Sequence, residues 1–153
     1  MTGVQTCALP ICAGAKTFDT TNATPAAAGA NVTFTGAVNG GVGLTVTAGT
    51  GGTVDFQGIV GGGTKPTSLN VTGNSIKLVA TDINGGINLT AQNLGTATLT
   101  GAVTSNNNAI NLVVDDLALT GSINSGGAAV NLTTATAART ITLGGAEIGR
   151  AHV

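Results

Sequence analysis

The residues that could carry acid–base or metal chemistry are few and scattered. Asp115 and Asp116 form the one adjacent acidic pair in the chain. A Ca2+ site or a catalytic carboxylate cluster needs several carboxylates on one face, and catalysis also needs a basic partner. The other charged residues between positions 13 and 146 are Asp19, Asp55, Asp82, Lys16, Lys65, Lys77 and Arg139. We therefore predict no catalytic, cofactor-binding or metal-binding residues, and we expect Asp115–Asp116 to lie in a turn.

The glycine-rich segments also lack the patterns that bind ions. The stretch Gly51-Gly52-Thr53-Val54-Asp55 lacks the third glycine of the tandem Ca2+-binding nonapeptide, and no G-x-x-x-x-G-K-[ST] phosphate loop is present. Cys7 and Cys12 have a spacing that could indicate a disulfide or half of a metal site. Both cysteines, and the single histidine His152, lie in the terminal segments described next.

The two ends of the chain resemble translated sequencing adapter. Residues 5–11 and 147–153 can be encoded by stretches that are reverse complements of each other, which two unrelated peptide ends rarely share. A segment of this origin carries no information about the fold of the protein. We treat 1–12 and 147–153 as adapter-derived, with Cys12 and Glu147 as junction codons, and expect both segments to lie outside the fold.

Composition excludes several functional classes. Charged residues make up 7% and aromatic residues 2% of the chain, against roughly 25% charged in a typical domain. With a net charge of −1 there is no electrostatic case for binding nucleic acid or an anionic membrane. No apolar run approaches the ~18 residues of a membrane span. The 42% hydrophobic content, with Val, Leu and Ile alternating with Thr and Asn, favours half-buried β-strands over disorder.

These strands recur at a fixed period. An apolar–polar–apolar unit begins at residue 32 and returns at 54, 76, 97, 117 and 141, in steps of 22, 22, 21, 20 and 24 residues. A second such unit follows each of the first five, and between them lie turns rich in Gly and Asn, each preceded by a branched apolar residue. Those residues are Val38, Val60, Ile83, Val103 and Ile123. A period of this size is typical of a solenoid.

We predict an all-β fold, a right-handed parallel β-helix of about five to six coils of ~22 residues, over residues 32–146. Equivalent residues would stack about 4.8 Å apart in columns. Two inward columns are expected: Val32, Val54, Ile76, Ala97, Leu117 and Ile141, and Phe34, Phe56, Leu78, Leu99, Leu119 and Leu143. Asp55 and Lys77 would form an outward contact between coils. Residues 13–31 are a lead-in or a degraded coil, in which Thr17-Phe18-Asp19 could be a remnant strand. An antiparallel sandwich also has alternating strands, but it does not require a matched unit every ~22 residues.

One outward column of the second strand is rich in asparagine. Its members are Asn70, Asn88, Asn111 and Asn131. The simplest interpretation is a ladder of side-chain amides bonded along the stack. Asn-x-Thr at positions 31, 70, 88 and 131 also matches the glycosylation acceptor pattern, as expected by coincidence in Thr/Asn-rich strands. A flat Thr/Asn face could alternatively bind ice, which requires regular rows of Thr-x-Thr or its equivalents.

The units VTFTGAVNGG (32–41) and LTGSINSGG (119–127) resemble the repeats of large bacterial surface exoproteins. The similarity is to filamentous-haemagglutinin-like adhesins and to the β-helical passengers of autotransporters, and it covers residues 32–146. It is a resemblance of repeat style, and no receptor-binding motif is present to carry over. It implies a secreted or cell-surface protein, outer membrane-associated in its full-length form, with host-surface or carbohydrate receptors as partners.

The expected function is that of a non-enzymatic structural segment of an adhesin, which projects a binding region and contributes to adhesion. The alternative is a fragment of a β-helical carbohydrate-active enzyme, such as a polysaccharide lyase or hydrolase, with its active site outside this chain. In either case we expect no cofactor, no nucleic acid and no membrane contact by this segment. Uncapped coils expose unpaired strand edges, so we also expect end-to-end self-association.

Overall fold

The computed structural model describes residues 14–21 and 28–139, and within these ranges the chain is built from strands, turns and bends without a helix. The strands run in the order β1 (Lys16–Asp19), β2 (Val32–Phe34), β3 (Gly43–Thr47), β4 (Thr53–Phe56), β5 (Ser68–Gly73), β6 (Ser75–Leu78), β7 (Thr81–Asp82), β8 (Ile87–Ala91), β9 (Thr96–Leu99), β10 (Ala102–Thr104), β11 (Ile110–Val113), β12 (Asp116–Leu119), β13 (Ser122–Asn124) and β14 (Val130–Thr133).

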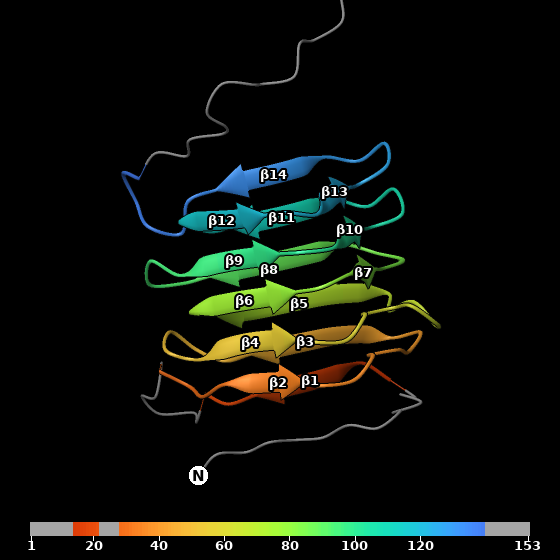
Figure 1. Ribbon diagram of the computed structural model, residues 1–153, viewed down its shortest axis with the longest axis horizontal. Helices are drawn as coiled ribbons and strands as arrows, with labels where there is room; N and C mark the ends of the chain where they lie inside the picture. The colour runs from red at the N-terminus through yellow and green to blue at the C-terminus, as the bar shows by residue number, and fades with distance from the viewer. Residues whose placement is uncertain (1–13, 22–27, 140–153) are drawn as a thin grey trace, which may run out of the picture.

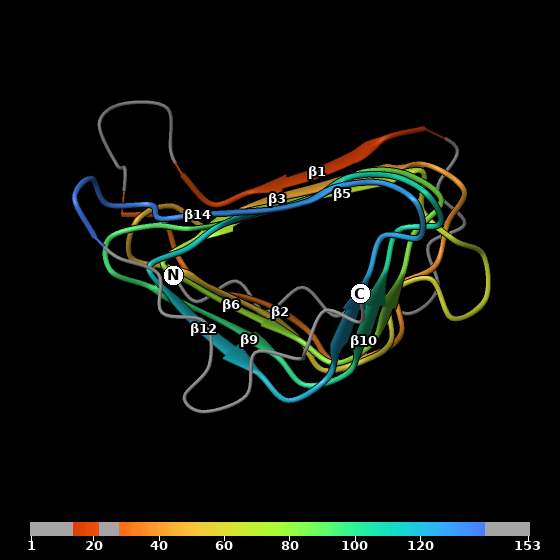
Figure 2. The same ribbon diagram turned by 90° about the horizontal axis from the view of Figure 1, so that it is seen from above.

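The strands form three parallel sheets that enclose one core, so the predicted parallel β-helix is confirmed. Sheet A has the order β1-β3-β5-β8-β11-β14, sheet B the order β12-β9-β6-β4-β2, and sheet C the order β13-β10-β7. Figure 1 shows the chain rising from β2 to β14 as a right-handed coil, with sheet B in front and sheet A behind. Seen along the coil axis, the sheets are the sides of a triangle (Figure 2).

The predicted inward columns are confirmed by the register of sheet B. Val32, Val54, Ile76, Ala97 and Leu117 pair rung by rung, as do Phe34, Phe56, Leu78, Leu99 and Leu119. Within the middle coils these side chains are buried almost completely, from Val54 at 0% exposed to Phe56 at 1%. Aliphatic residues of similar size stack without voids, and the strand backbones are hydrogen-bonded to the coils above and below. The members Ile141 and Leu143 lie outside the described residues.

The lead-in contributes a strand. In β1, Phe18 is the register partner of Val46, so Thr17-Phe18-Asp19 continues sheet A by one rung below β3. The Phe18 ring meets the Phe34 ring edge-on, with centroids 5.3 Å apart, and Phe34 stacks on Phe56 at 4.6 Å. Residues 16–19 of the lead-in therefore form a strand of sheet A. The two adapter-like segments lie outside the described residues.

The sequence indicates a third sheet, sheet C, only through the branched apolar residue that precedes each turn. Its column runs Val38, Val60, Thr81, Val103 and Ile123, so the third member is Thr81 and not Ile83. Ile83 lies two residues later, where its amide donates to the Thr104 carbonyl, and it is also fully buried. Thr81 is 2% exposed, and its hydroxyl has no hydrogen-bond partner. A polar side chain therefore interrupts an otherwise apolar column.

The corners between the sheets need residues that accept a tight backbone approach. Gly61 has φ +80°, and a Cβ there would lie 1.9 Å from the Asp82 carbonyl oxygen. At the corner between sheets A and B, a Cβ on Gly95 would lie 1.4 Å from the Asn74 carbonyl oxygen. Only glycine fits where one coil lies this close to the next. The glycines therefore set how closely the coils stack.

Candidate functional site

The acidic pair does not form a shared site, because its two carboxylates have different partners. Asp115 lies between β11 and β12, and it accepts hydrogen bonds from the Thr136 amide at 2.8 Å and the Thr136 hydroxyl at 2.5 Å. Asp116 is the first residue of β12, and its carboxylate accepts a bond of 3.2 Å from the Thr96 hydroxyl. The expected turn therefore holds Asp115 but not Asp116, which belongs to the strand.

Asp115 anchors the chain that follows β14. Its side chain is 1% exposed, and the Arg139 Nε lies 4.0 Å from one carboxylate oxygen. The hydroxyl hydrogen bond from Thr136, the Thr136 amide and the Arg139 charge together hold the pKa of Asp115 below its usual value, against the effect of burial. A carboxylate held ionised by these bonds is suited to fixing a turn.

A second polar cluster is centred on Asp82, in sheet C. The Lys65 ammonium lies 2.8 Å from one carboxylate oxygen, and Asn106 Nδ2 donates to the other at 2.7 Å. The hydrogen bond from Lys65 is the main cause of the lowered pKa of Asp82. Asn106 also bonds the Ile83 carbonyl at 2.9 Å. These contacts tie the loop of residues 61–67 to two later coils.

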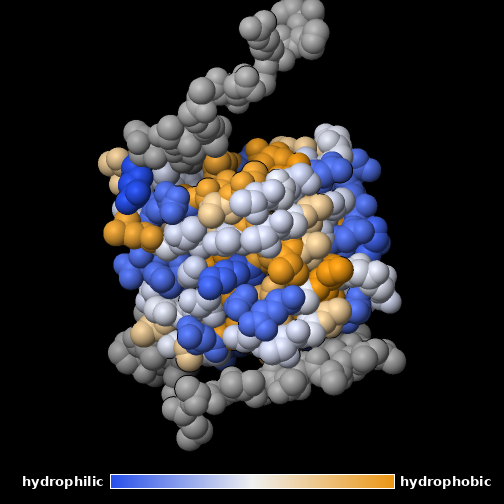
Figure 3. All heavy atoms as spheres, in the orientation of Figure 1, coloured by the Kyte–Doolittle hydropathy of each residue, from blue (hydrophilic) through white to orange (hydrophobic). Residues whose placement is uncertain are grey.

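Sheet B carries the predicted Asp55–Lys77 pair. The two residues are register partners on β4 and β6, as predicted. The Asp55 carboxylate, however, accepts a hydrogen bond of 3.0 Å from Gln57, the residue that follows the end of β4. The ion pairs within residues 14–21 and 28–139 are Lys65–Asp82 and Arg139–Asp115, so the Asp55–Lys77 contact is not one of them. Hydrophilic and hydrophobic residues are interspersed over this face (Figure 3).

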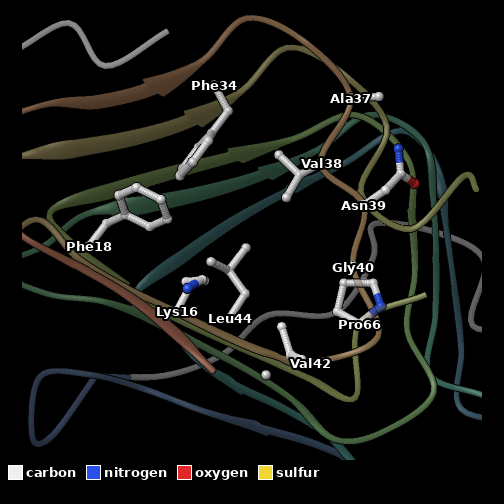
Figure 4. A pocket seen from close by; sticks show the side chains of 11 residues that line it. Lys16, Phe18, Phe34, Ala37, Val38, Asn39, Gly40, Val42, Leu44 and Pro66 are labelled. Carbon is white, nitrogen blue, oxygen red and sulfur yellow. The ribbon is translucent and has the colours of Figure 1, made fainter. Parts of the chain in front are cut away.

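An apolar cavity of about 170 Å3 opens at the β1 end of the solenoid. Figure 4 shows Phe18 and Phe34 on one side of it, and Val38, Leu44 and Pro66 on the other. Lys16 is the charged residue among its lining side chains. The cavity lies where the interior of the coil opens beside its first rung. Its lining supplies shape and apolar surface but no acid–base pair.

The asparagine column on sheet A is confirmed as a ladder. Asn88 donates to Asn70, Asn111 to Asn88 and Asn131 to Asn111, each from Nδ2 to Oδ1 at 2.7 Å. The register continues the column downward through Thr45 and Thr17. The ladder is the most regular polar arrangement in the described part of the chain.

Two features of the site region were not predicted. The 61–67 loop lengthens one repeat, so that Leu69 follows Leu44 by 25 residues while Ile87 follows Leu69 by 18. This change in the spacing of the second strands is the feature of the sequence that could have revealed the inserted loop. The Thr136 bonds to Asp115 had none, because they join residues 21 positions apart outside the repeated strands.

No group of three or more His, Cys, Asp or Glu residues that could hold a metal ion is found within residues 14–21 and 28–139. In the same residues, no helix is long and apolar enough to cross a membrane. Searches of known protein families, curated proteins and solved structures find no match to this chain.

Proposed function

We propose that this chain is a non-enzymatic structural segment of a secreted or surface-anchored bacterial adhesin, a stalk that projects a binding region away from the cell. The observation that carries this proposal is the unbroken pairing of sheets A and B through the coils, with a core of matched columns. In a solenoid each coil contacts only its neighbours, so coils add length without changing the fold.

The polar side chains support a structural role over an enzymatic one. Asp82 joins Lys65 to Asn106, Asp115 holds Thr136, and the asparagine amides bond each other. Each of these groups is used to connect one coil or turn to another. The style of the repeats supports the bacterial cell surface as the setting, and host-surface or carbohydrate receptors as partners of the full-length protein.

The ends of the described solenoid support a further part of the proposal, end-to-end self-association. β14, β13 and β12 are the last strands of their sheets, and Val130 and Leu119 are 45% and 43% exposed. Edge strands of low charge are templates for pairing with another chain. Sedimentation over a rising concentration series should show growing oligomers. A monomer at every concentration would contradict this part.

A display experiment tests the stalk. The full chain is placed between an outer-membrane anchor and a terminal peptide epitope on bacteria, and the distance from the epitope to a membrane dye is measured by energy transfer. Five coils at about 4.8 Å each should move the epitope outward by about 24 Å relative to a direct fusion. The same fusion carrying Gly95→Ala, which disrupts a corner, should give a broader distribution of epitope distances, because a loosened chain has no fixed length.

The enzymatic alternative has its own readout. The purified chain is incubated with a panel of acidic and neutral polysaccharides, and new reducing ends or unsaturated products are measured. We expect none above the level of a boiled control. Cleavage that is abolished by Asp82→Asn or Asp115→Asn would overturn the proposal of a non-enzymatic structural segment. If there is no cleavage and the epitope is not moved outward in the display experiment, only the proposed stalk role is rejected.

A further inference from the structure

The outer surface of sheet A is a two-column array. We call it the ladder face and define it by the outward residues of β3, β5, β8, β11 and β14. The first column is Thr45, Asn70, Asn88, Asn111 and Asn131, and the second is Thr47, Thr72, Thr90, Val113 and Thr133. Neighbours within a column are about 4.8 Å apart, and the two columns are about 6.6 Å apart along the strands. The face is therefore periodic in two directions.

The array is flat and held in place. Viewed along the coil axis, β3, β5 and β14 lie over one another, while β1 diverges from them (Figure 2). The first column is fixed by the amide bonds that run from Asn131 to Asn70. An internal asparagine such as Asn88 uses one amide hydrogen and accepts one bond in the ladder, which leaves one hydrogen and one lone pair directed to the solvent. Every residue of the second column has a β-branched side chain with a γ-methyl group, because its members are threonines and Val113.

Charge is kept off the ladder face. Of the charged residues in the described part of the chain, Asp55, Lys77 and Asp116 belong to sheet B and Asp82 to sheet C. Lys65, Asp115 and Arg139 lie outside the strands. The charged residues of sheet A are Lys16 and Asp19, both on β1. From β3 to β14 the outward surface of the strands thus holds hydroxyl, amide and methyl groups alone, whereas on β1 Asp19 is the register partner of Thr47 and ends the uncharged part of the second column.

The chemistry of the face narrows the choice of ligand. An ionic ligand finds no counter-charge on it. A soluble sugar chain usually requires an aromatic platform, and the three phenylalanines, Phe18, Phe34 and Phe56, stack with one another toward the interior. A rigid lattice of neutral donors and acceptors fits better, because many weak contacts form at once when both surfaces are periodic and pre-ordered.

We propose that the ladder face adsorbs to ice. The first column offers amide and hydroxyl donors and acceptors at fixed positions to the water molecules of the ice lattice. The γ-methyl groups of the second column exclude disordered liquid water from the space between the protein and the ice. Ionised side chains would order water radially around themselves and disturb that lattice, and the rungs from β3 to β14 carry none on this face. This activity is independent of the proposed stalk role, and a chain with either property can lack the other.

The test measures adsorption of the full chain, labelled with a fluorophore, to a growing ice hemisphere, and inhibition of ice recrystallisation by the unlabelled chain. Thr90→Lys places a charge at the centre of the second column and should raise the concentration needed for inhibition at least tenfold. Thr33→Lys is the matched control on sheet B, where the register partner is Asp55, and should leave the activity unchanged. Thr90→Val keeps the methyl and should retain activity, whereas Thr90→Ser should weaken it.

Circular dichroism confirms that each variant is folded before it is assayed. The proposal is overturned if the folded wild-type chain behaves like serum albumin in both ice assays, or if Thr90→Lys and Thr33→Lys lose activity equally. Binding of the wild-type chain to crystalline cellulose or chitin with no effect on ice would assign the face to a polysaccharide surface instead, and would also reject it.

Discussion

Asn111 and Asn88 occupy the same outward position on adjacent coils, and the Asn111 amide donates a hydrogen bond of 2.7 Å to the Asn88 carbonyl oxygen. Neither residue touches the core, yet the pair links β11 to β8 in addition to the backbone ladder. A side-chain ladder of this kind also favours a flat sheet over a twisted one.

The first prediction concerns the energy of this link. In a double-mutant cycle of Asn88→Ala and Asn111→Ala, the two residues should couple by about 0.5–1 kcal/mol in the free energy of unfolding, as a single hydrogen bond does. Chemical denaturation of the four proteins measures it. The pair Asn88 and Thr33, which lie on different sheets, serves as the control. Strictly additive losses for Asn88 and Asn111 would show that the ladder contributes nothing.

The second prediction concerns Thr81. Its hydroxyl is buried without a partner in the column between Val60 and Val103, and such a group costs about 1–3 kcal/mol. Thr81→Val removes the hydroxyl and keeps the branched shape, so it should stabilise the fold by about 1 kcal/mol. Thr33→Val, at a partly exposed position, controls for β-propensity. A loss of stability in Thr81→Val would mean that the hydroxyl is satisfied in solution.

The third prediction concerns the corner at Gly95. An alanine Cβ there would meet the Asn74 carbonyl oxygen at 1.4 Å, so the two coils would have to separate. Gly95→Ala should destabilise the protein by roughly 3 kcal/mol, the upper range for overpacking. Gly36→Ala is the matched control, because nothing lies within 4 Å of its Cβ position. Equal thermal midpoints for the two variants would refute the stacking at this corner.

The fourth prediction concerns acid. The pKa values of Asp82, Asp115 and Asp19 are lowered in the fold, chiefly by hydrogen bonds from Lys65, Thr136 and Thr21 respectively. A lowered pKa means that the stabilisation is complete above the pKa of the unfolded chain, about 3.9, and is lost as the pH falls through the folded value. The thermal midpoint should therefore be constant from pH 7 to 5 and fall below about pH 4.

The variant Asp82→Asn separates this effect from general acid unfolding. Its thermal midpoint should be lower than that of the wild type at pH 7 and should change less between pH 4 and pH 2. The difference should be small, because the Asp82 side chain is 38% exposed and solvent screens the pair. An identical acid slope in both proteins would show that the Lys65–Asp82 contact has no energetic weight.

The sequence predicted the columns because each one repeats the same choice of residue on every coil. Alternation in Val54–Phe56 and Ile76–Leu78 determines which side chains point inward, and the period then determines which residues stack. Sheet C lacked this signal. Its strands span two or three residues, which is too few for an alternation of apolar and polar residues to show. The sequence therefore predicts Ile83 at the position in the column that Thr81 occupies.

The polar contacts were less predictable than the register. Asp55 and Lys77 are aligned as expected, but register fixes backbone positions and leaves long side chains free to choose nearer partners such as Gln57. The Asp82 cluster depends on Lys65, in the inserted loop of residues 61–67 that interrupts the period. Hydrogen bonds between irregular segments have no periodic pattern, so the structure was needed to find them.

The central claim is that equivalent residues of successive coils stack at a constant step. It is tested by pulsed electron paramagnetic resonance on pairs of spin labels in the outward column of sheet B, with Cys7 and Cys12 replaced by serine. Thr33 is labelled with Thr98, three rungs away, or with Ala118, four rungs away. The account predicts distances near 14 and 19 Å, increasing by about 4.8 Å per rung. A Thr33–Ala118 distance equal to or shorter than the Thr33–Thr98 distance would contradict a parallel solenoid.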